Sequence, residues 1–297
     1  MFESAQLPRG RWAGLYSQWR PTLQYCMQTE VHVYALAIAA SVLLSFFPFM
    51  IVMVSLARYV LHWSLAVDTI YLALDDFFPG ELGDFIKRNL RATVDLRGPF
   101  QFTSVFLLLF TANGIFEPLE VALNRAWGVV VNRSYLRNQL VSLGLIFVCG
   151  SLALASFGLT ALNRQWLAGS WGPWLEQWGW NFGNWMILAM FKAAAIPLSI
   201  LALFLVYWLL PNRRIPARLV LPYAILVGLA LEALKYFNLL TWTLLDNKLR
   251  HEYGPFRISV TILLWSFIAA MMLLAGAEWS ARSGRARETA APGIETH

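Results

Sequence analysis

One uncharged apolar run limits the fold of this chain more than any other feature. No charged residue occurs from Val33 to Ala57, and about 20 apolar residues suffice to cross the roughly 30 Å of hydrocarbon in a bilayer. Such a run predicts a membrane helix, because a helix satisfies every backbone polar group internally. Composition agrees, since 58% of the residues are hydrophobic and 13% are charged, whereas soluble domains carry about a quarter charged residues. The sequence therefore predicts an all-α polytopic membrane protein and excludes disordered and disulfide-rich classes.

Six segments are expected to be membrane spans. They are residues 33–57, 100–116, 139–162, 184–210, 219–245 and 258–277. We expect one integral membrane domain over residues 1–297, with an outer loop at 58–99 and a flexible cytoplasmic tail at 283–297. The first run is too long for the apolar region of a cleaved signal peptide, so it is interpreted as an uncleaved first span.

Basic residues predict the orientation of these spans. Twelve arginines fall in the N-terminal segment, the second and fourth loops and the tail. The opposite side receives nine basic residues, five of them in the long first loop beside six acidic residues. Because cytoplasmic loops hold surplus Lys and Arg, both termini are expected in the cytoplasm. The net charge of +6 is attributed to this pattern, and no nucleic-acid partner is expected.

The first outer loop contains a predicted amphipathic helix. From Glu81 onward, apolar residues recur at helical spacing and charged residues occupy the opposite face. The apolar positions are Leu82, Phe85, Ile86, Leu90 and Val94. This pattern predicts a helix that lies on the outer membrane surface or caps the bundle. It also offers a surface for an envelope protein partner.

Six Trp residues lie between Trp166 and Trp185. Indole side chains favour the headgroup level of a bilayer, so this stretch is interpreted as an aromatic belt that anchors the third and fourth spans. A platform for carbohydrate or a lipid headgroup is the alternative.

Residues with catalytic or metal-binding chemistry are few and scattered. The four His residues and two Cys residues form no recognisable metal, hydrolase or nucleotide-binding motif. An acidic group, Asp75, Asp76, Glu81 and Asp84, has the chemistry of a cation site, but a solvated loop beside the Pro79-Gly80 turn explains it more simply. No enzyme activity, metal or cofactor is expected.

Charged residues inside the spans are the most informative polar feature. Glu232 falls at the middle of the fifth expected span, and Lys235 follows three residues later on the same helical face. Lys192 lies in the fourth expected span, about 7.5 Å from its middle at 1.5 Å per residue. The three side chains therefore lie at compatible depths, and the cost of charge in a bilayer directs them toward the bundle interior.

Two interpretations of these charges remain open. The first is an ion-pair cluster that only fixes helix packing, and the second is a polar cavity for an anionic headgroup or a proton-coupled step. Asn113 in the second span and Asn238 in the fifth add polar groups to such a cavity, or bond neighbouring helices.

Several motifs resemble one known family. They are AIAASVLLSFFP from Ala37 to Pro48, LEVALNRAWGV from Leu119 to Val129, the stretch from Leu209 to Phe237, Tyr253-Gly254, and LLAGAEWSA from Leu273 to Ala281. In order and spacing they are similar to the YihY/BrkB family of bacterial inner-membrane proteins, over about residues 30–282. The matching positions singled out are Pro48, Asn124, Trp127, Tyr253, Gly254, Gly276 and Glu278, together with Glu232 and Lys235.

The resemblance implies six membrane helices and a role in the cell envelope. Members have been called ribonuclease BN, a label now regarded as mistaken, and others are associated with serum resistance or lipid movement. We therefore expect a transporter or flippase of an anionic lipid or lipid-linked envelope precursor. A structural scaffold is the chief alternative and a membrane-bound RNA-processing enzyme a remote one. Substrate, energy source and oligomeric state are left open.

Overall fold

The computed structural model describes the backbone of residues 20–95, 99–129, 134–166 and 196–290, and the side chains of these ranges except 75–77, 99–102, 104, 108–113, 135, 157–166 and 286–290. The described chain is helical and has no strand, which confirms the all-α prediction. After a short helix at residues 20–26 come α2 (Thr29–Ser55), the π-helix η1 (Leu56–Val60), α3 (Ser64–Phe77), α4 (Glu81–Asp95), α5 (Pro99–Ala126), α6 (Tyr135–Trp166), the helical segment Ile196–Leu209, α9 (Ala217–Tyr253), the 3-10 turn η3 (Gly254–Phe256) and α10 (Arg257–Ala290).

Long apolar helices coincide with four of the six expected spans, at 33–57, 139–162, 219–245 and 258–277, whereas residues 184–195 of the fourth span lie outside the described residues. Three described stretches are long and apolar enough to cross a membrane: Thr29–Val60, Leu136–Ser156 and Ala217–Arg285. The last of these contains both α9 and α10. Apolar helices therefore confirm a polytopic membrane protein, while the number of six spans stays a prediction.

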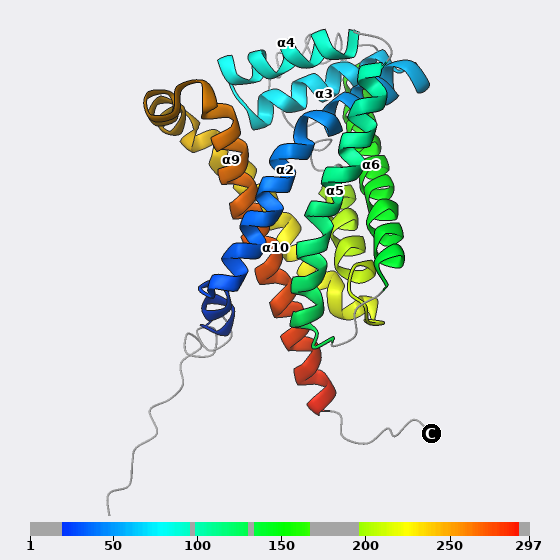
Figure 1. Ribbon diagram of the computed structural model, residues 1–297, viewed down its shortest axis with the longest axis vertical. Helices are drawn as coiled ribbons and strands as arrows, with labels where there is room; N and C mark the ends of the chain where they lie inside the picture. The colour runs from blue at the N-terminus through cyan, green and yellow to red at the C-terminus, as the bar shows by residue number, and fades with distance from the viewer. Residues whose placement is uncertain (1–19, 96–98, 130–133, 167–195, 291–297) are drawn as a thin grey trace, which may run out of the picture.

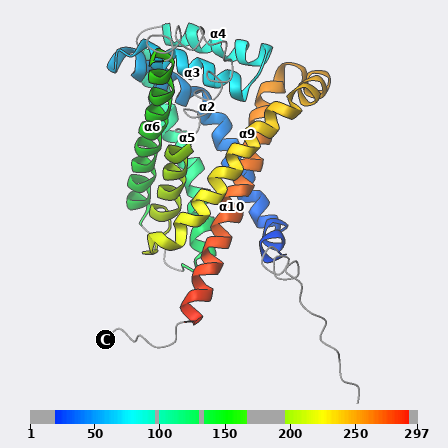
Figure 2. The same ribbon diagram turned by 180° about the vertical axis from the view of Figure 1, so that it is seen from behind.

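The long helices form a bundle with two distinct ends. α2 packs most extensively against α5 and α10, and α10 also packs along α9. α9 and α10 run antiparallel, since Val227 faces Gly276 and Phe237 faces Trp265. α2 begins and α10 ends at the same end, called here the terminal end (Figures 1 and 2). α3 and α4 lie across the opposite end, called here the cap end.

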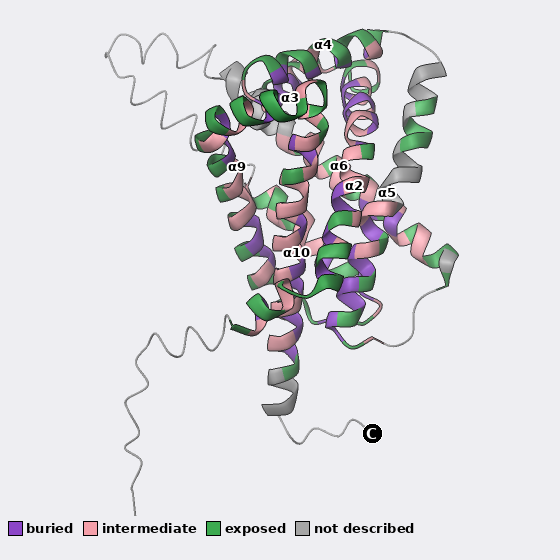
Figure 3. Cartoon of the chain, turned by 60° about the vertical axis from the view of Figure 1, so that its left-hand side comes forward, coloured by how far each residue is buried: buried purple, intermediate pink, exposed green. Residues whose placement is uncertain are grey.

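The cap confirms the predicted amphipathic helix of the first loop. Leu82, Ile86, Leu90 and Val94 of α4 are buried against α2 and α3, while Phe85 is 44% exposed. The charged residues Asp84, Arg88 and Arg91 of α4 are exposed, and Figure 3 shows buried and exposed residues alternating along this helix. α4 therefore caps the bundle. α3, which the sequence analysis did not predict, supplies much of the surface on which α4 rests.

Several helices extend beyond the expected boundaries, most of all at the ends of α5 and α10. α5 continues past Pro118 to Ala126, because Leu119, Leu123 and Ala126 recur on one face and are buried in the main core. α10 continues to Ala290, so the flexible tail predicted from residue 283 is wrong for residues 283–290. The physical reason is packing, since Ser283 accepts a hydrogen bond from Tyr223 and Gly284 lies against Trp127.

Candidate functional site

The middle of α9 carries a polar stripe inside an otherwise apolar helix. Lys235 Nζ forms an ion pair with Glu232 Oε1, as the three-residue spacing predicts. The Glu232 side chain is 26% exposed and the Lys235 side chain 18% exposed. The two charges neutralise each other while each remains partly accessible.

Residues one turn before the pair, on the same face of α9, are closely packed. Gly228 lies against Ile200, where a Cβ atom would come 2.7 Å from the Ile200 side chain. Leu231 packs against the main core. Toward the cap end, Lys235 Nζ lies 5.1 Å from the centre of the Tyr236 ring, which adds a cation–π contact. The pair thus sits at the border between the packed and the exposed sides of α9.

The structure places the remaining predicted binding residues unevenly. Asn238 follows Lys235 by three residues and is 4% exposed, so it continues the polar stripe into the interior. Asn113 belongs to α5, but its side chain lies outside the described residues. Lys192 and the Trp-rich stretch also lie outside them. The described site is therefore Glu232, Lys235 and Asn238 on one helix.

A second polar group, the Glu278 cluster, joins the beginning of the described chain to α10. Thr22 Oγ1 donates to Glu278 Oε2 at 3.0 Å and accepts from an Arg282 guanidinium nitrogen at 2.8 Å. Arg282 also lies 3.7 Å from Glu278 Oε1. Burial, with the nearby negative charge of Glu278, raises the pKa of Tyr25 to about 12. The cluster fastens the helix at residues 20–26 to the terminal end of the bundle.

Asn124 and Trp127 end α5 at the same terminal end. Gly128, with φ +67°, closes the helix, and the Val129 and Gly128 amides donate to the Asn124 and Arg125 carbonyls at 2.8 and 3.1 Å. These two hydrogen bonds form a Schellman motif, which favours a glycine at the helix end. The Trp127 ring packs against Gly284, where a Cβ atom would come 2.7 Å from the ring. The LEVALNRAWGV motif therefore builds a helix end.

The other family-motif positions also form parts of the fold, namely a helix interior, a turn and a contact between helices. Pro48 is buried inside α2, which stays continuous. Tyr253 is 45% exposed at the end of α9, and Gly254, at φ +50°, makes the turn into α10. At Gly276 a Cβ atom would overlap Val227 and lie 2.9 Å from the Tyr207 hydroxyl. Two glycines thus set the α9–α10 hairpin.

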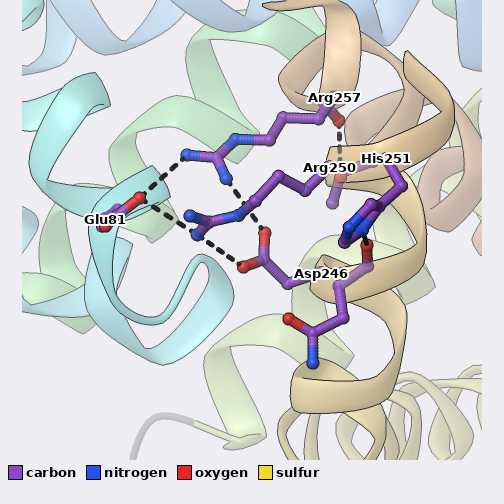
Figure 4. A network of polar contacts seen from close by, with 7 residues as sticks. Glu81, Asp246, Arg250, His251 and Arg257 are labelled. Atoms are coloured by element: carbon purple, nitrogen blue, oxygen red, sulfur yellow. Dashed lines mark hydrogen bonds and ion pairs between the residues drawn. The ribbon is translucent and has the colours of Figure 1, made fainter. Parts of the chain in front are cut away.

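At the cap end, a network of charges ties α4 to the α9–α10 turn (Figure 4). Arg250 lies 3.0 Å from Glu81 and 3.1 Å from Asp246, and Arg257 lies 3.5 Å from Glu81 and 3.4 Å from Asp246. The sequence analysis missed this network, because Glu81 lies 169 positions from Arg250 and 176 from Arg257.

The same network bears on the acidic group considered as a cation site. Glu81 contacts two arginines, and Lys87 Nζ lies 3.0 Å from Asp84, whose pKa this hydrogen bond and charge lower. The side chains of Asp75 and Asp76 lie outside the description. Among the described residues, no group of three or more His, Cys, Asp or Glu side chains is placed to hold a metal ion.

A pocket of about 430 Å³ lies on α6. It is open and mostly apolar, and its lining residues are Phe147, Val148, Ser151, Leu152 and Ala155. None of the predicted binding residues contributes to it.

Comparison with known proteins places these motifs in context. Residues 22–295 match the family described as Virulence factor BrkB. The chain is 23% identical over 253 residues to the ribonuclease-like protein YfkH of Bacillus subtilis, covering 80% of this chain and 85% of that protein. It is 22% identical over 276 residues to a UPF0761 membrane protein of Alteromonas mediterranea, covering 90% and 87%. No solved structure gives a significant match.

Proposed function

Since the chain belongs to the BrkB family of membrane proteins, we propose that it binds an anionic lipid or lipid-linked envelope precursor and moves it across the bacterial inner membrane. The Glu232–Lys235 ion pair carries this proposal. Each charge at the middle of a span costs at least about 2.5 kcal/mol. A pair retained at that depth, and still partly exposed, favours a binding site over simple packing.

The charges of the pair would allow Lys235 to exchange Glu232 for another anionic partner. In the structure, Glu232 neutralises the Lys235 ammonium group. A phosphate or carboxylate headgroup would take the place of Glu232 as the partner of Lys235, and Asn238 would donate from its amide group. In the proposed orientation both termini are cytoplasmic, and Lys192 and Asn113 stay expected members of the site. No ATPase motif occurs in the sequence, so an ion gradient or a partner would supply the energy.

Native mass spectrometry of the purified protein tests the proposal. Wild type is compared with the double variant Glu232→Gln, Lys235→Met for retention of a defined anionic lipid. The matched control is Glu252→Gln, Lys248→Met, which removes an ion pair of 3.9 Å from the exposed end of the same helix. We expect wild type and control to retain the lipid and the folded double variant to lose it. Equal retention by all three proteins would reject the site.

A scaffold without transport is the alternative from a different class. It is favoured by the several charge contacts that join separate helices at both bundle ends. Because the apolar face of α4 is buried, an envelope protein partner would meet the charged face of that helix. In this case the double variant would lose thermal stability in detergent, while lipid retention per folded molecule would not change.

The name of the Bacillus relative keeps an RNA-processing function as a separate test. Purified protein is incubated with precursor tRNA and Mg²⁺, which nucleases commonly use for phosphate chemistry. We expect no cleavage above the level of a mock purification. Reproducible cleavage that increases with protein concentration would replace the transport proposal.

A further inference from the structure

The loop between the helical segment Ile196–Leu209 and α9 concentrates positive charge. This loop and the first turn of α9, residues 211–218, are called here the arginine loop, and they carry Arg213, Arg214 and Arg218. All three arginines are exposed. No Asp or Glu occurs in the sequence between Glu176 and Glu232. The local charge is therefore strongly positive.

The backbone of the arginine loop is held in one conformation. The Asn212 amide donates to Asn124 Oδ1 at 2.7 Å, and Trp208 Nε1 donates to the Ile215 carbonyl oxygen at 2.9 Å. Leu210 is 0% exposed and Ile215 is 5% exposed. Because these contacts fix the loop backbone, a ligand that binds its arginines has to order their side chains but little of the backbone.

Two other arginines at the terminal end already have acidic partners. Arg125 pairs with Glu30, and Arg282 pairs with Glu278. Arg213 donates to the Trp127 carbonyl oxygen at 3.5 Å. Arg214 and Arg218 form no ion pair with any residue in the described part of the chain. Within the arginine loop, the charge available to an outside anion is thus concentrated on these two side chains.

An exposed apolar face begins directly beside Arg218. Leu221, Ile225 and Leu229 follow along α9 at helical spacing, and they are 45%, 39% and 51% exposed. The Arg218 side chain, in the first helical turn, is directed back toward the loop. Trp208, 40% exposed and stacked on Phe204 at 5.8 Å, borders the same loop. Positive charge at a helix end and apolar surface along the helix together match an amphipathic anion.

We propose that the arginine loop binds the phosphate group of an anionic phospholipid, whose acyl chain lies along Leu221, Ile225 and Leu229. Guanidinium groups bind phosphate through paired, charge-assisted hydrogen bonds. The adjoining apolar face favours a lipid over free phosphate or nucleic acid. The site lies at the terminal end and does not depend on transport through the Glu232–Lys235 pair.

The test measures lipid retention by the full chain in detergent with native mass spectrometry. Phosphatidylglycerol is compared with phosphatidylcholine of the same acyl chains. We expect the variant Arg214→Gln, Arg218→Gln to lower phosphatidylglycerol retention about tenfold and leave phosphatidylcholine unchanged. The control Arg20→Gln, Arg137→Gln removes the same charge from exposed arginines elsewhere and should retain wild-type binding.

A second variant separates the hydrogen-bond geometry of the guanidinium groups from their positive charge. Arg214→Lys, Arg218→Lys keeps both charges but loses the paired hydrogen bonds, so we expect intermediate retention. An equal loss in the Arg20, Arg137 control would overturn the proposal, because it would show only diffuse attraction to a basic surface. So would displacement of phosphatidylglycerol by inorganic phosphate, which would indicate a site for the free anion. Unchanged retention in both loop variants would reject the site directly.

Discussion

The backbone amide of Asn212 donates a hydrogen bond of 2.7 Å to Oδ1 of Asn124, so the arginine loop is fastened to the end of α5. Asn124 is 3% exposed, and its Nδ2 donates to Glu120 at 3.4 Å. Asn124→Ala removes the acceptor and leaves a partly buried amide without it, at a cost of about 1–3 kcal/mol. We expect a lower midpoint of thermal unfolding in detergent.

The exposed Asn247 provides the control for this prediction. Asn247→Ala removes the same side chain from the surface of α9 and should shift the midpoint little. If Asn124→Ala and Asn247→Ala unfold at the same temperature, the bond to Asn212 does not stabilise the loop.

Gly276 gives a second prediction about helix contact. A Cβ atom there would overlap Val227 and approach the Tyr207 hydroxyl, which donates to the Leu273 carbonyl oxygen at 2.7 Å. Gly276→Ala should therefore destabilise the fold by about 1–3 kcal/mol through overpacking. Gly144, also in a helix, has open space around its Cβ position. Gly144→Ala should raise the unfolding temperature slightly, because alanine favours a helix by about 0.5–1 kcal/mol.

The two substitutions form the test because they should shift the unfolding temperature in opposite directions. Differential scanning fluorimetry of both variants beside wild type measures these shifts. Stabilisation by Gly276→Ala would contradict the close contact between α9 and α10.

The cap-end network predicts unequal effects of its two carboxylates. The Asp246 and Arg257 side chains are 19% and 18% exposed, whereas the Glu81 side chain is 70% exposed. Exposed ion pairs contribute about 0–1 kcal/mol, and partly buried ones are screened less by water and salt. Asp246→Asn should therefore lower stability clearly, and Glu81→Gln should lower it slightly.

Salt concentration provides an internal check on this ranking. The effect of Glu81→Gln should disappear at high salt, while that of Asp246→Asn should persist. Thermal unfolding of both variants at low and high NaCl measures the difference. A larger loss of stability for Glu81→Gln than for Asp246→Asn would contradict the ranking of the two carboxylates.

Periodicity predicted the local structure of this chain well. The helix from Glu81 has four of its five predicted apolar positions buried, Phe85 being exposed, and the three-residue spacing of Glu232 and Lys235 produced an ion pair. Both features depend on neighbours within one helix, whose geometry a sequence specifies directly.

Contacts between helices were harder to predict, because residues such as Glu81 and Arg250 are 169 positions apart. Boundaries failed where tertiary packing extends a helix, as at Gly284 in α10. α3 was missed because its apolar residues stand between two stronger patterns. The Asn124 contact to Asn212 had one signal, the family motif around Asn124, but that motif does not specify the partner.

Cys26 gives the last prediction, which concerns pH. Burial, and secondarily the charge of Glu278, raises the pKa of the Cys26 thiol. The reactive thiolate then forms at a higher pH than in an unperturbed thiol, whose pKa is about 8.5. Folded protein keeps this proton longer than unfolded protein, so the thiol lowers stability as pH rises above the ordinary value. Iodoacetamide labelling of a Cys149→Ala variant across alkaline pH should show a raised midpoint in folded protein and the ordinary midpoint in denatured protein. Glu278→Gln should lower the folded midpoint only partly, because burial is the larger cause. Equal midpoints in folded and denatured protein would show that folding does not bury the Cys26 thiol enough to raise its pKa.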